Sequence, residues 1–160
     1  MRHAILIATL FVAVGCAGQP VNTAPTSTSG SSGRATTAGN VVGASTSRAA
    51  IENFLAAVKT ADLQGMSALW GNDKGPAREK FSREELEKRL VIMQCSLQHD
   101  RWNFIEDAPR PQTGGRHAWS VNFNRKRVTA KGTMITVQGP GGRWFLEDVP
   151  DIGGLKALCA

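Results

Sequence analysis

The sequence predicts an α+β domain in which helices come first and an antiparallel sheet follows, joined to an export signal by a flexible tether. Three observations carry this prediction. Apolar residues recur at helical spacing up to about residue 98 and then alternate with polar residues up to residue 148. The first 15 residues hold a short apolar run, and residues 16–47 hold one charge and no aromatic ring. All 13 acidic and 17 of the 19 basic residues lie in 48–160, which marks that range as the folded part.

Length and composition bound the class of protein. A chain of 160 residues holds one domain with accessory segments, and its net charge of +6 is moderate. The composition excludes a collagen-like chain, a wholly disordered chain and a small disulfide scaffold.

Residues 1–15 are predicted to be a secretory signal peptide. Met1-Arg2-His3 is basic, and the run from Ala4 to Val14 is apolar. Eleven residues span roughly 16 Å as a helix, about half of a bilayer core, so a permanent transmembrane helix is not expected.

The end of this run is similar to a known processing motif. Ala13-Val14-Gly15-Cys16 resembles the lipobox of bacterial lipoproteins, whose cysteine is diacylated and becomes the mature N-terminus. The resemblance implies that Cys16 is lipidated and that the protein is anchored to a bilayer of the cell envelope. Because Ala17 is not Asp, similarity to enterobacterial sorting favours the outer membrane, facing the periplasm. The alternative is an ordinary signal peptide followed by a chance cysteine.

Residues 16–47 are predicted to form the lipidated cysteine and its tether. Of the 31 residues after Cys16, 24 are Ala, Gly, Ser, Thr or Pro, and such a stretch buries too little apolar surface to offset the entropy of ordering it. A flexible chain of this length has a root-mean-square reach of about 30 Å. The folded domain is then 48–160.

Three helices are predicted at the start of this domain. The first is capped by Ser47, covers 48–61, and carries one apolar stripe. The second begins at Asp62, and a turn cluster over 71–76 follows it. The third covers 83–98, with Ser82 and Glu85 as a capping box and Phe81 against Leu86 as a hydrophobic staple. Its buried seam is predicted to consist of Leu86, Leu90, Met93 and Leu97.

About four antiparallel strands are predicted next, as a meander. They cover 101–107, the segment around Trp119, Val121 and Phe123, then 128–138 with a bulge at Gly132, and 143–148. Residues 107–115 are predicted to be a loop, and 125–127 a tight connection. A short helix over 154–159 ends the chain. Helices packed on one face of such a sheet give an α+β fold.

The opening of the domain resembles a known superfamily. Ala50-Ile-Glu-Asn-Phe-Leu-Ala-Ala-Val-Lys-Thr-Ala-Asp-Leu-Gln-Gly-Met-Ser-Ala-Leu-Trp70, with a helix and a meander after it, is similar to nuclear transport factor 2-like domains, which include ketosteroid isomerase and scytalone dehydratase. The chain looks most like uncharacterised bacterial lipoproteins of this fold. The resemblance implies three helices packed on a curved, cone-like sheet. Enzymes, binding proteins and assembly modules all share this fold, so it implies no single activity.

Two cysteines remain after Cys16. In an exported chain an even remainder favours a disulfide, here Cys95–Cys159, which ties the C-terminal tail to the third helix. The alternative is a pair of buried free thiols.

An acid–base enzyme is the second functional hypothesis, with His117 or Asp100 as the acting group. Ketosteroid-isomerase chemistry commonly uses a Tyr donor, and this chain has no Tyr. His99-Asp100 fits a junction between helix and strand, whereas His117 shares a face with Trp119 by alternation. A non-catalytic domain is therefore favoured over an enzyme.

Other chemistry finds little support in the sequence. The histidines and carboxylates lack metal-site spacing, so no metal or cofactor is expected. Gly139-Pro-Gly-Gly142 lacks the features of a phosphate-binding loop, and Arg125-Lys126-Arg127 fits a solvated hairpin end, so a nucleic-acid partner is not expected.

The aromatic residues provide the candidate pocket. Either they line an apolar cavity on the concave face of the sheet or they fill it as a core. The candidate pocket residues are Trp70, Trp102, Phe104, His117, Trp119 and Phe123. The sequence thus predicts a membrane-anchored envelope lipoprotein whose domain binds a small apolar ligand or another envelope protein.

Overall fold

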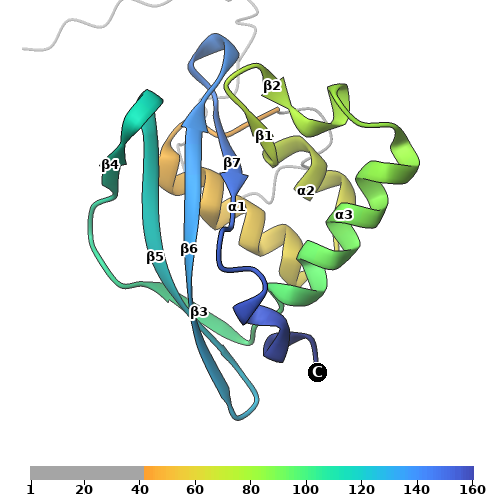
Figure 1. Cartoon of the computed structure of the whole chain (residues 1–160), viewed down its shortest axis with the longest axis vertical. Coiled ribbons are helices and arrows are strands. Elements are labelled where there is room, and N and C mark those ends of the chain that lie inside the picture. The colour runs from red at the N-terminus through yellow and green to blue at the C-terminus, as the bar shows by residue number, and fades with distance from the viewer. Residues whose placement is uncertain (1–41) are drawn as a thin grey trace, which may run out of the picture. The chain divides into compact units, whose positions relative to one another are not determined.

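A computed structural model describes residues 42–160 of the chain (Figure 1). The predicted signal peptide, Cys16 and the first part of the predicted tether lie outside the described residues. The described range is an α+β domain with an antiparallel sheet, which confirms the predicted class. No helix within 42–160 combines the length and the apolar character needed to cross a bilayer.

Within the described residues, three α-helices precede the large sheet. They are α1 (Ser47–Lys59), α2 (Leu63–Leu69) and α3 (Arg83–Ser96). The same part of the chain also holds four short 3-10 helices, η1 (Ala77–Glu79), η2 (Thr113–Gly115), η3 (Pro140–Gly142) and η4 (Gly154–Cys159). The last of these occupies the position of the predicted C-terminal helix.

The N-cap of α1 is Thr46 rather than the predicted Ser47. The Thr46 side chain accepts a 3.0 Å hydrogen bond from the Ala49 backbone amide. The Ser47 hydroxyl is buried and bonded to the sheet instead, so it is not available as a cap. The short α2 starts where the sequence predicts, because the Asp62 side chain accepts from the Gly65 amide at 2.9 Å.

The start and the buried seam of α3 are confirmed. Ser82 Oγ accepts from the Glu85 amide at 3.3 Å, and Leu86, Leu90, Met93 and Leu97 are buried. The other half of the predicted capping box differs, because the Glu85 carboxylate accepts a 2.7 Å hydrogen bond from Arg89. Phe81 stacks on the ring of Trp70, with centroids 5.6 Å apart.

The large sheet has five strands where the sequence predicts about four. Its strands are β3 (Arg101–Phe104), β4 (Arg110–Gln112), β5 (Arg116–Arg125), β6 (Val128–Gln138) and β7 (Trp144–Asp148). The order is β3-β5-β6-β7, and β4 also pairs with β5. The predicted loop over 107–115 therefore contains a strand. Pro111 within β4 is tolerated because, on a strand with a free edge, not every backbone amide has to donate a hydrogen bond to a neighbouring strand.

Two further details of the sheet differ from the sequence prediction. The predicted turn cluster forms a small hairpin, β1 (Gly71–Asn72) and β2 (Gly75–Pro76). The register shift in β6 lies between Ile135 and Thr136, whereas Gly132 pairs in register with Val121. Gly132 has another role, since a Cβ there would lie 3.0 Å from Leu155 of η4.

The core lies between α1 and one face of the sheet. Helix α1 packs on β6 and β7, crossing behind them in Figure 1, and η4 packs on β6 and α3. Trp119, Val121 and Phe123 of β5 are buried on this face, as the alternation predicts. Leu155 and Leu158 of η4 complete the same core.

The folded unit begins before the predicted boundary at residue 48. Ala44 is 1% exposed and exchanges backbone hydrogen bonds with Trp144 of β7, at 2.8 and 2.9 Å. The Gly43 amide donates to Ala68 O at 2.8 Å. Residues 42–46, assigned by composition to the tether, are thus part of the domain.

Candidate functional site

The aromatic side chains of β3 and β5 pack on one another. Trp102 meets Phe104 edge-on at 5.0 Å between centroids, and Phe104 lies 4.6 Å from Trp119. The Arg48 guanidinium lies 4.4 Å from the Phe104 centroid, and Phe123 is fully buried. Four of the six candidate pocket residues therefore fill space in or beside the core.

His117 is held by a neighbouring ring. Its imidazole stacks on Trp144 with centroids 4.6 Å apart, and its Nδ1 is buried with no hydrogen-bond partner within the described residues. Its backbone oxygen accepts a 3.3 Å hydrogen bond from Thr136 Oγ1. This arrangement presents His117 as a packing residue against Trp144 of β7.

Asp100, the second acid–base candidate, has a structural role in a turn. The Asp100 carboxylate accepts a 2.7 Å hydrogen bond from the Lys126 amide, so it fixes the turn between β5 and β6. The neighbouring His99 is 7% exposed, with Nδ1 2.9 Å from Leu97 O. Burial lowers the pKa of His99 and the positive charge of Lys59 lowers it further, against the opposing effects of the Leu97 hydrogen bond and Asp100.

Cys95 and Cys159 are joined by a disulfide in this structure, with Cα atoms 4.8 Å apart. The bond connects α3 to η4, and Cys159 is exposed. Arg125 and Lys126 donate to the backbone oxygens of Leu158 and Ala160, so both side chains hold the same segment.

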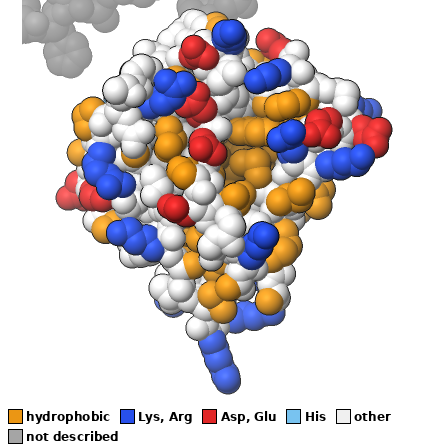
Figure 2. All heavy atoms as spheres, viewed as in Figure 1, with side chains coloured by type: hydrophobic (Ala, Val, Ile, Leu, Met, Phe, Trp, Pro, Cys, Tyr) orange, Lys and Arg blue, Asp and Glu red, His pale blue; other side chains and the backbone are white. Residues whose placement is uncertain are grey.

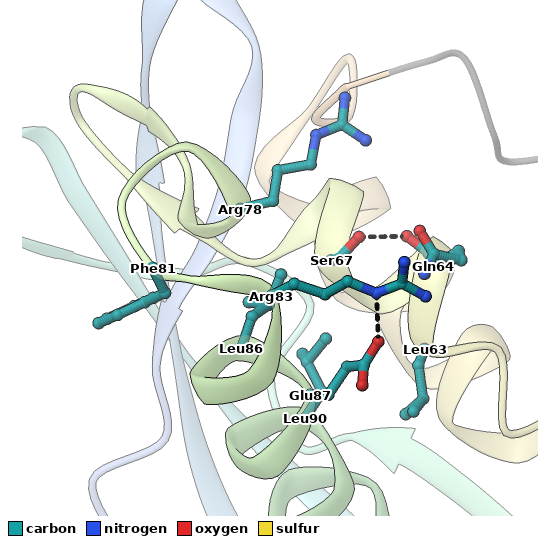
Figure 3. Close-up of a pocket in the computed structure, with 9 residues that line it drawn as sticks. All are labelled: Leu63, Gln64, Ser67, Arg78, Phe81, Arg83, Leu86, Glu87 and Leu90. Carbon is teal, nitrogen blue, oxygen red and sulfur yellow. Dashed lines mark hydrogen bonds and ion pairs between the residues drawn. The ribbon is translucent and has the colours of Figure 1, made fainter.

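One cleft lies between α2 and α3. We call it the α2–α3 cleft; its volume is about 430 Å³ (Figure 3). Leu63, Phe81, Leu86 and Leu90 supply its apolar surface. The polar lining consists of Gln64, Ser67, Arg78, Arg83 and Glu87.

A second hollow lies between β7 and α3. We call it the Trp70 groove; its volume is about 270 Å³. It is lined by Trp70, Arg89, Ile92, Met93, Glu147, Asp148, Val149 and Ile152. Figure 2 shows hydrophobic side chains gathered in a hollow between the strands and α3, with charged side chains around it.

Trp70 is the one predicted pocket residue that lines this groove. Its Nε1 donates to Glu147 O at 3.4 Å, which holds the indole against β7. Arg116 donates to both carboxylate oxygens of Glu147, at 2.7 Å to Oε1, and these bonds and the Glu147 charge raise the pKa of Arg116. The Glu147 side chain is therefore fixed at the edge of the groove.

Metal-binding geometry is not found in the part of the chain that the structure describes. Within 42–160 no group of three or more His, Cys, Asp or Glu side chains gathers closely enough to hold an ion.

Sequence reasoning missed most of the residues that line these clefts. Arg78, Arg83 and Gln64 carry no motif, and they come together only when α2 packs on α3. The sequence could have indicated Ile92 as an exposed residue, because Val91-Ile92 are apolar residues outside the predicted seam of α3.

Comparison of the chain with protein-family models, curated proteins and solved structures gives no match.

Proposed function

We propose that this chain is a lipid-anchored protein of the bacterial cell envelope, whose nuclear transport factor 2-like domain docks a partner protein at the Trp70 groove. The lipobox-like segment ending at Cys16 supports the anchor, and Ala17 after it supports the outer membrane as the site of the anchor. The order of three helices with a hairpin, followed by a meander, supports the cone-like fold. The domain then acts as a non-catalytic assembly module at the membrane.

The observation that carries the docking role is the exposure of Ile92 at the edge of the groove. Ile92 is 62% exposed and its neighbour Val91 is 51% exposed, whereas the seam residues Leu86, Leu90, Met93 and Leu97 are buried. Large contiguous patches of exposed apolar side chains mark interaction surfaces. The indole of Trp70 supplies a large apolar contact in the same groove as Ile92.

The volume of the groove, about 270 Å³, is compatible with the insertion of one side chain of a partner protein. It suits a single aromatic or aliphatic side chain. Arg89 is paired with Glu85 and Glu147 with Arg116, so Asp148 is the charged lining residue without an ion pair among the described residues, and it is available to a polar group of the partner.

The alternative function, an acid–base enzyme, has fewer observations in its support than the docking role. His117 stacks on Trp144 and Asp100 binds the Lys126 amide, and neither residue lines the two clefts described above. General acid–base chemistry needs a titratable group within hydrogen-bond reach of a bound substrate. The arrangement favours docking over the acid–base enzyme.

Photo-crosslinking in cells tests the docking role. A photoreactive amino acid at position 92 should give one heterologous adduct, and the same residue at position 84, on the outer surface of α3, should not. The substitution Ile152→Asp should remove the adduct while the melting temperature of the purified protein stays within a few degrees. An adduct that also forms from position 84, persists in Ile152→Asp, or contains two copies of this chain would contradict the proposal.

Fractionation tests the anchor separately. Wild-type protein should be found in the membrane fraction with acyl chains on Cys16, and Cys16→Ser should lack them. A mass spectrum of the native protein with an unmodified Cys16 would exclude the lipoprotein assignment, whatever the crosslinking result.

A further inference from the structure

The face of the sheet opposite the core is polar near the turn between β5 and β6. Phe123 of β5 is buried in the core, so its neighbours Asn122 and Asn124 lie on the opposite face. The register places Arg101 of β3 opposite Asn124 and Lys131 of β6 opposite Asn122, so both cations share that face. The turn adds further cations beside them. We call this end of the sheet the basic hairpin surface; its cations are Arg101, Lys126, Arg127 and Lys131.

The basic hairpin surface carries an excess of positive charge. All of its cations are exposed, and among the described residues none of them forms an ion pair with an Asp or Glu side chain. The nearby Asp100 carboxylate accepts a hydrogen bond from the Lys126 amide, so we count these two charges as offsetting each other. Arg101, Arg127 and Lys131 are left as uncompensated cations.

The side chains between these cations suit a polar, anionic partner. On the outer face, the residues that lie between Arg101 and Lys131 are uncharged: Asn103, Asn122, Asn124 and Thr129. They offer amide and hydroxyl groups and no carboxylate. In Figure 1 the β5–β6 turn projects beyond the helices, and Figure 2, in the same view, shows basic side chains and no acidic ones at this tip. An extended anionic surface can therefore approach the tip without meeting an acidic side chain there.

The chain before the domain is long enough to let this tip reach the membrane of the proposed anchor. Ala44 is paired with Trp144, at the end of β6 that lies away from the β5–β6 turn. The 11 residues of β6 separate the two ends of the sheet by about 36 Å. The 25 residues from 17 to 41 span at most about 85 Å. The distance along the domain is therefore well within the reach of the segment that joins it to Cys16.

We propose that the basic hairpin surface docks the domain on anionic phospholipid headgroups of the bilayer that holds the anchor. This inference rests on the proposed anchor and is independent of the docking role of the Trp70 groove, with which the surface shares no residue. Each Lys or Arg near an anionic bilayer surface favours the bound position by about fivefold. The anchor adds to this effect, because it keeps the domain at a high effective concentration beside the headgroups.

Photo-crosslinking to lipid tests this contact in the full lipid-anchored protein, held in nanodiscs of phosphatidylcholine alone or of phosphatidylcholine and phosphatidylglycerol in equal parts. A photoreactive amino acid replaces Thr129, which is exposed and uncharged. Mass spectrometry should show at least about fivefold more lipid adduct in the nanodiscs with phosphatidylglycerol. The same amino acid at position 84, on the outer surface of α3, should give equal yields in the two nanodiscs. Equal yields from position 129 would overturn the proposal.

Charge variants show which residues make the contact. Arg127→Gln combined with Lys131→Gln should lower the adduct yield from position 129 at least about fivefold in the nanodiscs with phosphatidylglycerol. Lys74→Gln combined with Arg78→Gln is the matched control, since it removes one Lys and one Arg from exposed positions in the β1–β2 turn and η1. The control pair should leave the yield as in wild type. An equal fall in both pairs would reflect net charge alone and overturn the assignment to the basic hairpin surface.

The anchor and the basic hairpin surface can fail separately. A native protein with an unmodified Cys16 would refute the anchor, and its cosedimentation with vesicles of the same two compositions would then test the surface. Stronger binding to the vesicles with phosphatidylglycerol, lost in Arg127→Gln with Lys131→Gln and kept in the control pair, would support the surface. Equal binding to the two kinds of vesicle would refute it.

Discussion

Trp119 Nε1 donates a 2.8 Å hydrogen bond to Ser47 Oγ, which joins the middle of β5 to the first residue of α1. Ser47 Oγ also lies 2.7 Å from Thr136 Oγ1, and Thr136 Oγ1 donates to His117 O. Since Thr136 uses its proton on His117 O, Ser47 must donate to Thr136 and accept from Trp119. This chain of buried hydrogen bonds fixes α1 on the sheet.

Removal of the Ser47 hydroxyl should therefore destabilise the domain. Ser47→Ala leaves the Trp119 N–H unpaired in a buried place, and we expect a loss of about 1–3 kcal/mol in the free energy of unfolding. Urea denaturation measures it. Ser45→Ala, at an exposed neighbouring position, is the control and should change stability by less than about 0.5 kcal/mol. Equal midpoints for the two variants would show that the hydrogen-bonded chain adds no stability.

Reduction of the disulfide should lower the melting temperature by several degrees. The bond between Cys95 and Cys159 closes a loop with a sequence separation of 64. A constraint of that length is worth roughly 4 kcal/mol in the chain-entropy description. Calorimetry with and without a thiol reductant, with alkylation of the released cysteines, measures the effect. An unchanged melting temperature, or free thiols in the untreated native protein, would contradict the disulfide.

Stability should fall in mild acid because of His99. Burial lowers the pKa of this imidazole below its ordinary value of 6.5, so the unfolded chain binds a proton that the folded domain excludes. The contribution of His99 to the free energy of unfolding should therefore be complete above pH 6.5. It should fall as the pH drops below 6.5 toward the lowered pKa of the folded state.

The substitution His99→Gln isolates this contribution. It removes the titrating ring, and its amide retains a donor for Leu97 O. Denaturation midpoints between pH 5 and 7.5 should have a smaller slope in the variant than in wild type. Identical slopes would mean that another group causes the acid sensitivity.

Close backbone approach at Gly71 predicts a further loss of stability. A Cβ at Gly71 would lie 2.9 Å from Pro76 Cα and 2.9 Å from a ring carbon of Phe145, with Gly75 O closer still. Because part of this obstacle is backbone, Gly71→Ala should cost about 1–3 kcal/mol. Gly153→Ala has open space around it and should leave stability within about 0.5 kcal/mol of wild type. Thermal melts of both variants decide the point.

Local signals in the sequence predicted the elements well. Apolar spacing placed the seam of α3, and the Ser82 cap placed its first turn, because both act over a few residues. Strand β6 was predicted at its observed bounds, since turn residues flank it on both sides. Strand β4 was missed because Pro111 and the nearby glycines resemble a loop, and only pairing with β5 reveals it.

The surface hollows depend on contacts between distant segments. The sequence predicts a contact of Phe81 with Leu86, and the structure stacks Phe81 on Trp70, 11 positions earlier in the chain. Alternation placed Trp119 and Phe123 on one face, but it cannot show whether η4 covers that face. Arg78 and Leu63 become neighbours in one cleft only through helix packing, for which a single sequence carries no pattern.

The attachment of residues 42–44 also has a mechanical consequence. Arg143 donates to the backbone oxygens of Val42 and Gly43, at 3.1 and 2.6 Å, and Ala44 is paired with Trp144. A force that pulls the chain upstream of Val42 would therefore load these bonds beside β7 before it reaches α1. The first event under tension should be the peeling of this short segment, with the helices still in place.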